Sequence, residues 1–548
     1  MLALSLAAAC AAANGASLDG DGPATTERVI VRVAADAAWT DLAAELERAN
    51  VRVEAILTQA PLRVLVRAQS PAEGARLAAE LEASGRAAYA VPETFRPIEL
   101  RSRHVPNDPL FGEQWAFENT GQAGQVTGAD VDAPEAWAVT LGSPAVTIAV
   151  LDDGVQLDHP DLAANIAASG RDFTVYPPVE GAQPRTAADR HGTSVAGIAA
   201  ARGDNGIGVS GICPRCRILP IRVDGSSNLG VAEAFRYAVA QGADVITNSW
   251  GYAPSARRRD AAVDAAVRDA IDSAARDGRG GRGTLIVFGM TNEAVDNCGE
   301  HADISALDSV VAVGVSDHND RIGGSGFGDC MDLVAPSTPE RIDTKGSATT
   351  DRTGLDGHVD GDYFMAFGGT SAAAPLVAGV AGLLLSLNPD LTRTDLERIL
   401  EHTADKVDAE HAGYDAAGFS PRAGYGRVNA ARALVPSVKI TVQPARVAPG
   451  EPFSVTVAAS APLGLRSVLW RGAATGDAAL DGPHTQRLDG EGYAAVTWSM
   501  LALERPGTYA FEAVAEDAEV GEPVSGYPHG AWTGASLTVV ERTDDDSR

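Results

Sequence analysis

The central part of the chain alternates short apolar runs with longer stretches of helical pattern. Continuous apolar strands separated by helices predict a parallel sheet covered by helices on both faces. We therefore expect an α/β domain over residues 107–435, with ligands bound beyond the carboxyl ends of its strands. The strand-like runs are VTIAVLD (146–152), RILPIRV (217–223), DVITNSW (244–250), TLIVFG (284–289) and VVAVGV (310–315).

Residues 27–100 show a different and more compact pattern. Strand-like RVIVRV (28–33) precedes a helical stretch, and VRVEAIL and LRVLVRA precede a second helical stretch and a last strand, AAYAVPE. This predicts a small βαββαβ unit. No set of residues in it suggests chemistry, and the polar RSRHVPNDP (101–109) is typical of a linker.

The tail, residues 437–541, changes pattern again. Short alternating segments such as KITVQPA, FSVTVAA, AAVTWSM and TYAFEAVA are separated by Gly, Pro and Asp. Alternation with frequent turns predicts a β-sandwich.

Composition narrows the classes of partner. The chain has 548 residues, enough for two or three domains, and its formal net charge is −29. A charge this negative argues against nucleic acid as a partner and fits an extracellular protein.

The first residues, MLALSLAAACAAANGAS, are apolar and small like the core of a signal peptide, although no basic residues precede them. We take residues 1–26 as a leader. The stretch before Cys10 also resembles a lipoprotein site, which leaves lipid anchoring as an alternative to free secretion. No segment reaches the length that we expect of a membrane-spanning helix.

The remaining cysteines fall into two pairs. Cys213 and Cys216 form a CxxC, and Cys298 and Cys330 lie 32 residues apart. Zinc is one interpretation, but the second pair lacks metal-ligand spacing. In a secreted protein we expect disulfides, first Cys298–Cys330 and then Cys213–Cys216.

Three polar residues stand at a strand end or a helix start of the predicted α/β domain, where side chains can reach a ligand. Asp152 closes the first core strand, His191 opens a helix in HGTSVAGIAAA, and Ser371 begins the apolar run GTSAAAPLVAGVAGLLL. Each has an ordinary alternative, because aspartate forms turns, a lone histidine is often structural and serine caps helices. A helix start also offers free N–H groups and a positive dipole end to a developing oxyanion. With a base and an orienting acid nearby, Ser371 would be a nucleophile.

The motifs around these residues resemble a known family. LDDG, HGTSVAG and GTSAAAP match, in order, the three active-site motifs of the subtilisin-like serine proteases. DDG and NSWG (248–251) are similar to the kexin-type branch. The resemblance implies a subtilisin-like fold and a serine-type endopeptidase that acts on proteins or peptides.

The resemblance also implies roles for individual residues. Ser371 would attack the peptide carbonyl, His191 would carry the proton, and Asp152 would orient the imidazole. Asn292 stands where the family has its oxyanion-hole amide, although Thr291 replaces the usual Gly. Ser249, Trp250 and Gly251 would form a strand-like edge for substrate, with residues 289–292 walling the pocket.

Specificity and metal binding follow from the same resemblance. His301 stands where kexin-type enzymes have an Asp, although Asp296 and Asp303 are near, so we expect broad rather than strictly dibasic cleavage. A structural Ca²⁺ is implied, with a plain Asn-Gly turn as the alternative. Its expected ligands are the side chains of Asp108, Asp161 and Asn205 and the carbonyls of Arg202, Ile207 and Val209.

The resemblance further implies a zymogen. Residues 27–100 would be a propeptide that assists folding and inhibits its own enzyme, with self-cleavage within 97–106, where Arg103 is a candidate. The tail stands in the place of the kexin-type P domain. We expect a monomer that binds no nucleic acid. The alternatives are a catalytically silent binding protein on the same scaffold, and esterase activity as a side reaction.

Overall fold

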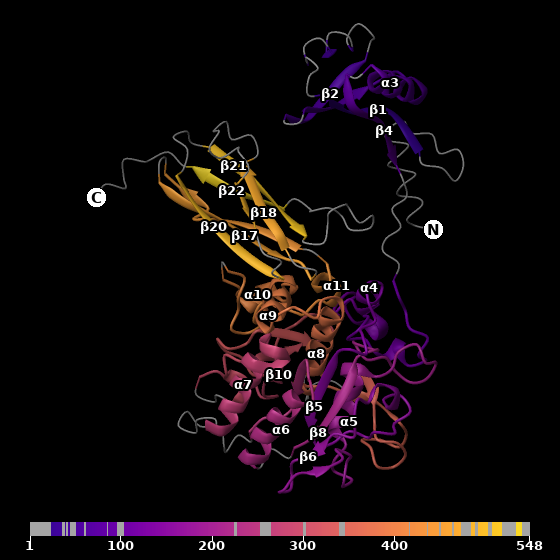
Figure 1. Ribbon diagram of the computed structural model, residues 1–548, viewed down its shortest axis with the longest axis vertical. Coiled ribbons are helices and arrows are strands. Elements are labelled where there is room, and N and C mark those ends of the chain that lie inside the picture. The colour runs from indigo at the N-terminus through magenta and orange to yellow at the C-terminus, as the bar shows by residue number, and fades with distance from the viewer. Residues whose placement is uncertain are drawn as a thin grey trace. The chain divides into compact units, whose positions relative to one another are not determined.

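The structure is a computed structural model (Figure 1). It describes most of residues 24–95, residues 103–435 except 224–226, 253–264, 300–302, 339–345 and 416, and the main strands of residues 437–539. The chain divides into two compact units, Met1–Ser102 and Arg103–Arg548. The predicted leader with Cys10, position His301 and residues 97–102 of the expected processing region lie outside the described residues.

The first unit contains a four-stranded antiparallel sheet with the order β2-β3-β1-β4. The helix predicted between β1 and β2 falls largely outside the described residues. Valines on β1 and β3 are fully buried in a small apolar core (Val29, Val31, Val64 and Val66). The elements are β1 (Ala24–Val33), β2 (Arg52–Gln59), β3 (Leu62–Arg67), α3 (Pro71–Ala83) and β4 (Ala87–Phe95).

The second unit is built on an eight-stranded sheet with the order β12-β11-β10-β9-β5-β8-β6-β7. The strands from β12 to β6 run parallel, and β7 pairs antiparallel with β6 at one edge. The predicted α/β class is confirmed. The strands are β5 (Thr147–Asp152), β6 (Arg171–Asp172), β7 (Val179–Glu180), β8 (Arg217–Arg222), β9 (Val245–Asn248), β10 (Leu285–Gly289), β11 (Val311–Ser316) and β12 (Leu333–Pro336).

Helices cover both faces of this sheet, each over its own apolar core (Figure 1). Helices α5 (His191–Ala200) and α8 (Thr370–Leu387) share one core, and α6 (Asn228–Ala240) and α7 (Ala265–Gly281) share the other. This is the two-sided burial that continuous apolar strands predict. The smaller helices are α4 (Ala133–Trp137), α9 (Arg393–Thr403), α10 (Ala409–Ala412) and α11 (Ala430–Ala433).

Helix α8 is the central helix of this unit and packs against α5 and strands β9 to β12. Among the described residues, it is the one helix long and apolar enough to cross a membrane, and 83% of it is buried inside the protein. The sequence-based statement that no segment has this length was therefore wrong. Burial against a sheet explains a helix that is apolar all round.

A two-stranded hairpin, β13 (Ser347–Thr350) and β14 (Tyr363–Phe367), precedes α8. Its strands are short and lie outside the main sheet, and the sequence pattern did not predict them.

The tail forms two facing sheets, with the orders β15-β17-β20 and β16-β22-β21-β18-β19. Alternate residues of β17 point into the core between them. The strands are β15 (Ser437–Gln443), β16 (Arg446–Val447), β17 (Pro452–Ser460), β18 (Leu465–Gly472), β19 (His484–Arg487), β20 (Tyr493–Leu501), β21 (Gly507–Asp517) and β22 (Thr533–Val539).

Two disulfides join the cysteine pairs, Cys213–Cys216 and Cys298–Cys330. The first is buried against α8, where a Cβ on Gly382 would lie 3.1 Å from the Cys216 sulfur.

Candidate active site

The carboxyl ends of the parallel strands bring Asp152 and His191 together. Asp152 ends β5 and is 4% exposed, and His191 is the first residue of α5. The imidazole Nδ1 lies 2.9 Å from Asp152 Oδ1. Because a carboxylate can only accept, Nδ1 carries the proton and Nε2 is the nitrogen with a lone pair.

The start of α5 sits directly against β5. A Cβ on Gly192 would lie 2.4 Å from the Gly154 carbonyl oxygen and 2.8 Å from Asp152 Cβ. Only glycine allows this approach, which brings the imidazole within reach of the carboxylate. The Gly after the His in HGTSVAG therefore has a packing reason.

Ser371 is the second residue of α8, and Phe367 four residues earlier links it to the base. The Phe367 ring packs edge-on against the His191 imidazole, with 5.4 Å between centroids. The Ser371 carbonyl accepts a hydrogen bond from Ser249 Oγ (3.0 Å), which holds the α8 start beside the end of β9. The candidate nucleophile and base thus share one edge of the sheet.

Asn292 lies against the turn that leads into Ser371. Its Oδ1 accepts from Thr370 N (2.9 Å) and Thr370 Oγ1 (3.0 Å), so the amide is oriented with its oxygen toward Thr370 and its NH₂ on the other side. Gly369, at φ +68°, makes room, because a Cβ there would lie 2.9 Å from Asn292 Oδ1.

Thr291, the departure from the family pattern, is buried and accommodated. Its methyl group faces Gly326, where a Cβ would lie 2.9 Å away, and its carbonyl accepts from Gly326 N (2.7 Å). A threonine here therefore leaves the neighbouring Asn292 in place.

The expected substrate edge follows β9. Trp250 is fixed by a hydrogen bond from Nε1 to the Leu151 carbonyl (2.9 Å). At Gly251 a Cβ would lie 2.6 Å from Asp303 Oδ2, so this segment passes close to a buried carboxylate.

The two acids near the expected pocket are engaged with backbone N–H groups. Asp303 accepts from the N–H groups of Tyr252 and Ile304, the latter at 2.7 Å. Asp296 Oδ1 accepts from Cys298 N (3.0 Å) and Gly299 N (2.8 Å). Carboxylates that stabilise turns in this way are less available to bind a basic side chain of a substrate.

The structure brings the predicted calcium side chains together. Asp108 accepts from Asp204 N (2.8 Å) and Asn205 N (3.3 Å). Asp161 accepts from Val209 N (2.9 Å) and from the Asn205 amide (2.7 Å). Two carboxylates from distant parts of the sequence thus converge on the loop at 202–209.

The remaining members of the set lie on the same loop. The Arg202 N–H donates to the Asp161 carbonyl (2.8 Å), and the Ile207 N–H donates to Asn205 Oδ1 (3.0 Å). Burial raises the pKa of Asp108, and raises the pKa of Asp161 to about 6. Among the described residues, no lysine or arginine forms an ion pair with either carboxylate. Buried carboxylates without a cation fit an oxygen-rich site for Ca²⁺.

Family comparison agrees with this geometry. A model described as "Subtilase family" matches residues 143–426, which include Asp152, His191 and Ser371. The chain belongs to the subtilase family.

Among curated subtilase relatives, the "Calcium-dependent protease" of Trichormus variabilis is 33% identical over 392 residues, which cover 67% of this chain and 55% of the relative. The "Thermophilic serine proteinase" of Bacillus sp. strain AK1 is 32% identical, covering 59% of this chain and 71% of the relative. The chain thus spans only about half the length of the first of these relatives.

A solved structure, the Aeromonas sobria serine protease in complex with its chaperone, covers 80% of this chain and 93% of its own. Its TM-score is 0.54 and its sequence identity 19%, so this likeness concerns the fold.

The structure adds residues that sequence reasoning left out. Asp153 accepts hydrogen bonds from the His191 and Gly192 N–H groups, and Thr370 orients Asn292. Both are neighbours of motif residues, but the contacts connect segments 38 and 78 residues apart. Their position in the motifs was the available signal.

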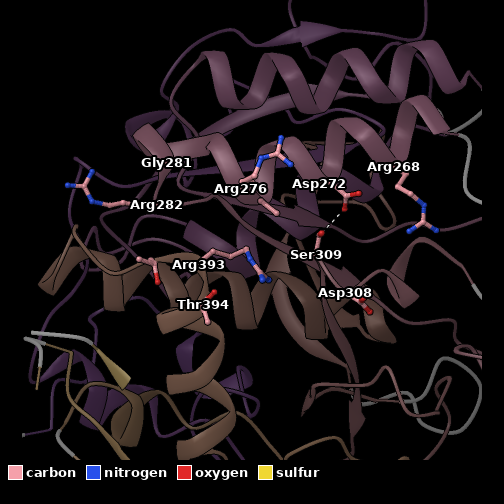
Figure 2. Close-up of a pocket in the computed structure, with 11 residues that line it drawn as sticks. Arg268, Asp272, Arg276, Gly281, Arg282, Asp308, Ser309, Arg393 and Thr394 are labelled. Carbon is pink, nitrogen blue, oxygen red and sulfur yellow. Dashed lines mark hydrogen bonds between the residues drawn. The ribbon is translucent and has the colours of Figure 1, made fainter. Parts of the chain in front are cut away.

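The subtilase domain has a concavity of about 680 Å³ between α7 and the start of α9 (Figure 2). It lies beside the amino ends of β10 and β11, opposite the candidate active site. Three of its arginines are paired with carboxylates, in Arg276–Asp277, Arg282–Asp390 and Arg393–Glu397. Figure 2 shows Arg268 and Arg282 at its opposite ends, and among the described residues that line it there is no histidine to serve as a base.

Proposed function

We propose that the protein is a serine endopeptidase that cleaves peptide bonds through Asp152, His191 and Ser371. The observation that carries this proposal is the 2.9 Å hydrogen bond between Asp152 and His191 at the edge where α8 presents Ser371. A buried carboxylate, an imidazole with a fixed tautomer and a serine at a helix start are the parts that acyl transfer needs.

The steps follow from these positions. Ser371 Oγ attacks the substrate carbonyl while His191 Nε2 takes its proton, and the same imidazole then protonates the departing amine. Asp152 stabilises the imidazolium that forms in between. Water repeats the sequence on the acyl-enzyme and frees Ser371.

The oxyanion is stabilised by two donors. The Asn292 NH₂ group is the end of the amide turned away from Thr370, and the Ser371 N–H lies in the first turn of α8, where backbone donors are not used by the helix.

We further propose broad specificity rather than strict dibasic cleavage. The carboxylates of Asp296 and Asp303 already accept hydrogen bonds from backbone N–H groups, as described above. A peptide library digested with processed enzyme tests this, and cleavage confined to sites after paired basic residues would contradict it.

We also propose that Ca²⁺ binds Asp108, Asp161, Asn205 and the carbonyls of Arg202, Ile207 and Val209. An ion held there would supply positive charge to two buried carboxylates and would fix the loop. The Tyr363 ring packs directly against Gly208 of this loop: a Cβ built on Gly208 would lie 2.1 Å from a ring carbon. Tyr363 begins β14, so the loop is in contact with the hairpin that leads to Ser371.

The zymogen is a proposal as well. Residues 27–100 fall within the first compact unit, Met1–Ser102, and we propose that they are an intramolecular inhibitor released by cleavage within 97–106. Secretion is supported by the two disulfides and by the extracellular relative of Natrialba magadii named a halolysin-like protease.

The test compares Ser371→Ala with Ser386→Ala, which lies on the same helix, donates to the Gly382 carbonyl and contacts the Cys216 sulfur. Ser371→Ala should abolish peptide hydrolysis and release of residues 1 to about 100. Ser386→Ala should retain both.

Two outcomes would contradict the proposal. Full processing of Ser371→Ala, made without any other protease, would refute self-cleavage. Wild-type protein that hydrolyses no peptide and takes no fluorophosphonate at Ser371 would instead be a binding protein on a subtilase scaffold.

A further inference from the structure

Helix α5, which carries His191, is capped from another part of the chain. Its own N-cap residue, Arg190, makes no side-chain cap. Instead, His191 N donates to Asp153 Oδ2 (3.0 Å) and Gly192 N donates to Asp153 Oδ1 (2.7 Å). One carboxylate thus satisfies two helix N–H groups and lies at the positive end of the helix dipole.

Asp153 is itself held in place. Its N–H donates to Asp152 Oδ1 (2.8 Å), and its carbonyl accepts from Arg222 Nε (2.9 Å). The Arg222 guanidinium is buried and bound by Asp172 and Asp189, the latter at 2.8 Å. The cap is therefore anchored to β8 as well as to β5.

We propose that Asp153 is a positioning residue for the base. It fixes the backbone of His191 at the distance from Asp152 that the imidazole–carboxylate hydrogen bond requires. The proposal rests on the proposed function, since it assigns His191 the role of base. It explains why a second aspartate follows the one that ends β5: Asp152 orients the imidazole, and Asp153 orients the helix that carries it.

The cap, meaning the two hydrogen bonds that Asp153 accepts from His191 N and Gly192 N, depends on the charge of the Asp153 carboxylate. The charged and titratable groups around it are Asp152 on β5, His191 on α5 and Arg222 on β8, with His358 of the β13–β14 loop beyond His191. Burial, and next the Asp152 carboxylate, raise the pKa of Asp153 to about 6. Protonation puts a hydrogen on one of the two Asp153 oxygens that accept from α5, so this cap weakens as the pH falls through about 6.

The test measures kcat and KM of processed enzyme from pH 5 to 8 for wild type, Asp153→Asn and Asp153→Ser. Asn and Ser each keep one acceptor for a helix N–H but carry no charge. Both variants should lose about 10- to 100-fold in kcat with KM within twofold, because misplaced catalytic groups cost rates of this order. In wild type, the fall of kcat at acid pH should reflect two ionisations, those of Asp153 and His191, and in the variants it should reflect that of His191 alone. This fall should also move to lower pH in the variants, because a negative charge near His191 is gone.

The matched control is Asp395→Asn, which removes the charge of the carboxylate that accepts from Thr392 N in the capping box of α9. It should lower Tm slightly, as weakening of a helix cap does, with kcat and its pH profile unchanged. If Asp153→Asn behaves like this control, Asp153 is only a helix cap and the proposal is overturned. A raised KM with unchanged kcat would overturn it too, because Asp153 would then act on substrate.

A second measurement separates this proposal from the proposed function. In a Ser371→Ala background, the downfield proton resonance of the His191 Nδ1–H···Asp152 bond should be present with Asp153 and weakened in Asp153→Asn or Asp153→Ser. This readout requires no activity, so an inactive wild type would refute the protease assignment alone. An unchanged resonance would refute the positioning role alone.

Discussion

Asn292 shows how one side chain is prepared for a role by its neighbours. The Thr370 N–H and hydroxyl both bind its oxygen, and Gly369 leaves the space that the amide fills. Orientation fixed before the reaction is what makes an oxyanion donor effective.

Replacing Asn292 with Ala should therefore lower kcat by about 10²- to 10³-fold, or about 3 kcal/mol of transition-state stabilisation, with little change in KM. Steady-state kinetics on a peptide substrate measures both constants. A rise in KM at constant kcat would mean that Asn292 binds substrate and not the oxyanion.

Thr370 should matter through Asn292. Thr370→Val removes the hydroxyl that bonds Asn292 Oδ1 and the Met290 carbonyl, whereas Thr370→Ser keeps it. We expect Val to lower kcat by about tenfold, since one of two bonds to the amide is lost, and Ser to retain most activity. Equal kcat for the two variants would show that the hydroxyl has no part in orienting the amide.

At the scale of elements, α9 places two glutamates, of which Glu401 is buried, beside the half-buried Asp332. The carboxylate oxygens of Asp332, Glu397 and Glu401 lie within 4.8 Å of one another. Arg393 pairs with Glu397 (2.7 Å) and Arg398 approaches Glu401 (3.6 Å). Burial raises the pKa of all three acids, and that of Glu401 to about 7.

These raised pKa values predict that ionisation of Glu401 lowers the free energy of unfolding at high pH. Glu401 binds its proton more tightly when folded than when unfolded, where its pKa is near 4.5, so the stability falls as the pH rises from about 4.5 to about 7. Glu401→Gln should thus raise stability at pH 8 by up to about 3 kcal/mol and flatten the profile.

The measurement is Tm across pH 5 to 8 in a Ser371→Ala background, so that autolysis does not enter. The control is Glu410→Gln at an exposed position of α10, which should change neither the Tm at pH 8 nor its dependence on pH. A lower Tm for Glu401→Gln at pH 8 would show that the ionised carboxylate stabilises the fold.

At the scale of the whole molecule, calcium should stabilise the folded chain by mass action. A free calcium concentration about 1,000-fold above Kd raises the free energy of unfolding by about 4 kcal/mol. Removing the calcium with a chelator should therefore lower Tm by several degrees. Asp161→Asn should lower Tm in calcium and abolish the effect of the chelator. The turn variant Asp296→Asn should keep that effect, and a chelator response that survives Asp161→Asn would place the ion elsewhere.

The parts predictable from sequence are those with a local signal. The five apolar strands of the central sheet were expected within one or two residues at most ends, because burial on both faces requires continuous apolar runs. Strand β12 and the hairpins β6–β7 and β13–β14 were missed, because they have two to five residues each and their pairing depends on distant segments.

The candidate site divides in the same way. Asp152, His191 and Ser371 stand in motifs, and a resemblance was enough to name them. The acceptance of α5 N–H groups by Asp153 and the pairing of Thr370 with Asn292 depend on how α5, β5 and α8 meet in space. Propensity and periodicity carry no information about such contacts.

One consequence follows from the place of α8. Its first turn presents the proposed nucleophile, Ser371, while the rest of its length fills the middle of the interior between the sheet and α5. Ser371 therefore has no hinge of its own, and we expect heat to displace it only when the surrounding sheet and helices unfold. Heat inactivation should accordingly be all-or-none, with residual labelling by a covalent inhibitor tracking near-ultraviolet circular dichroism through the transition.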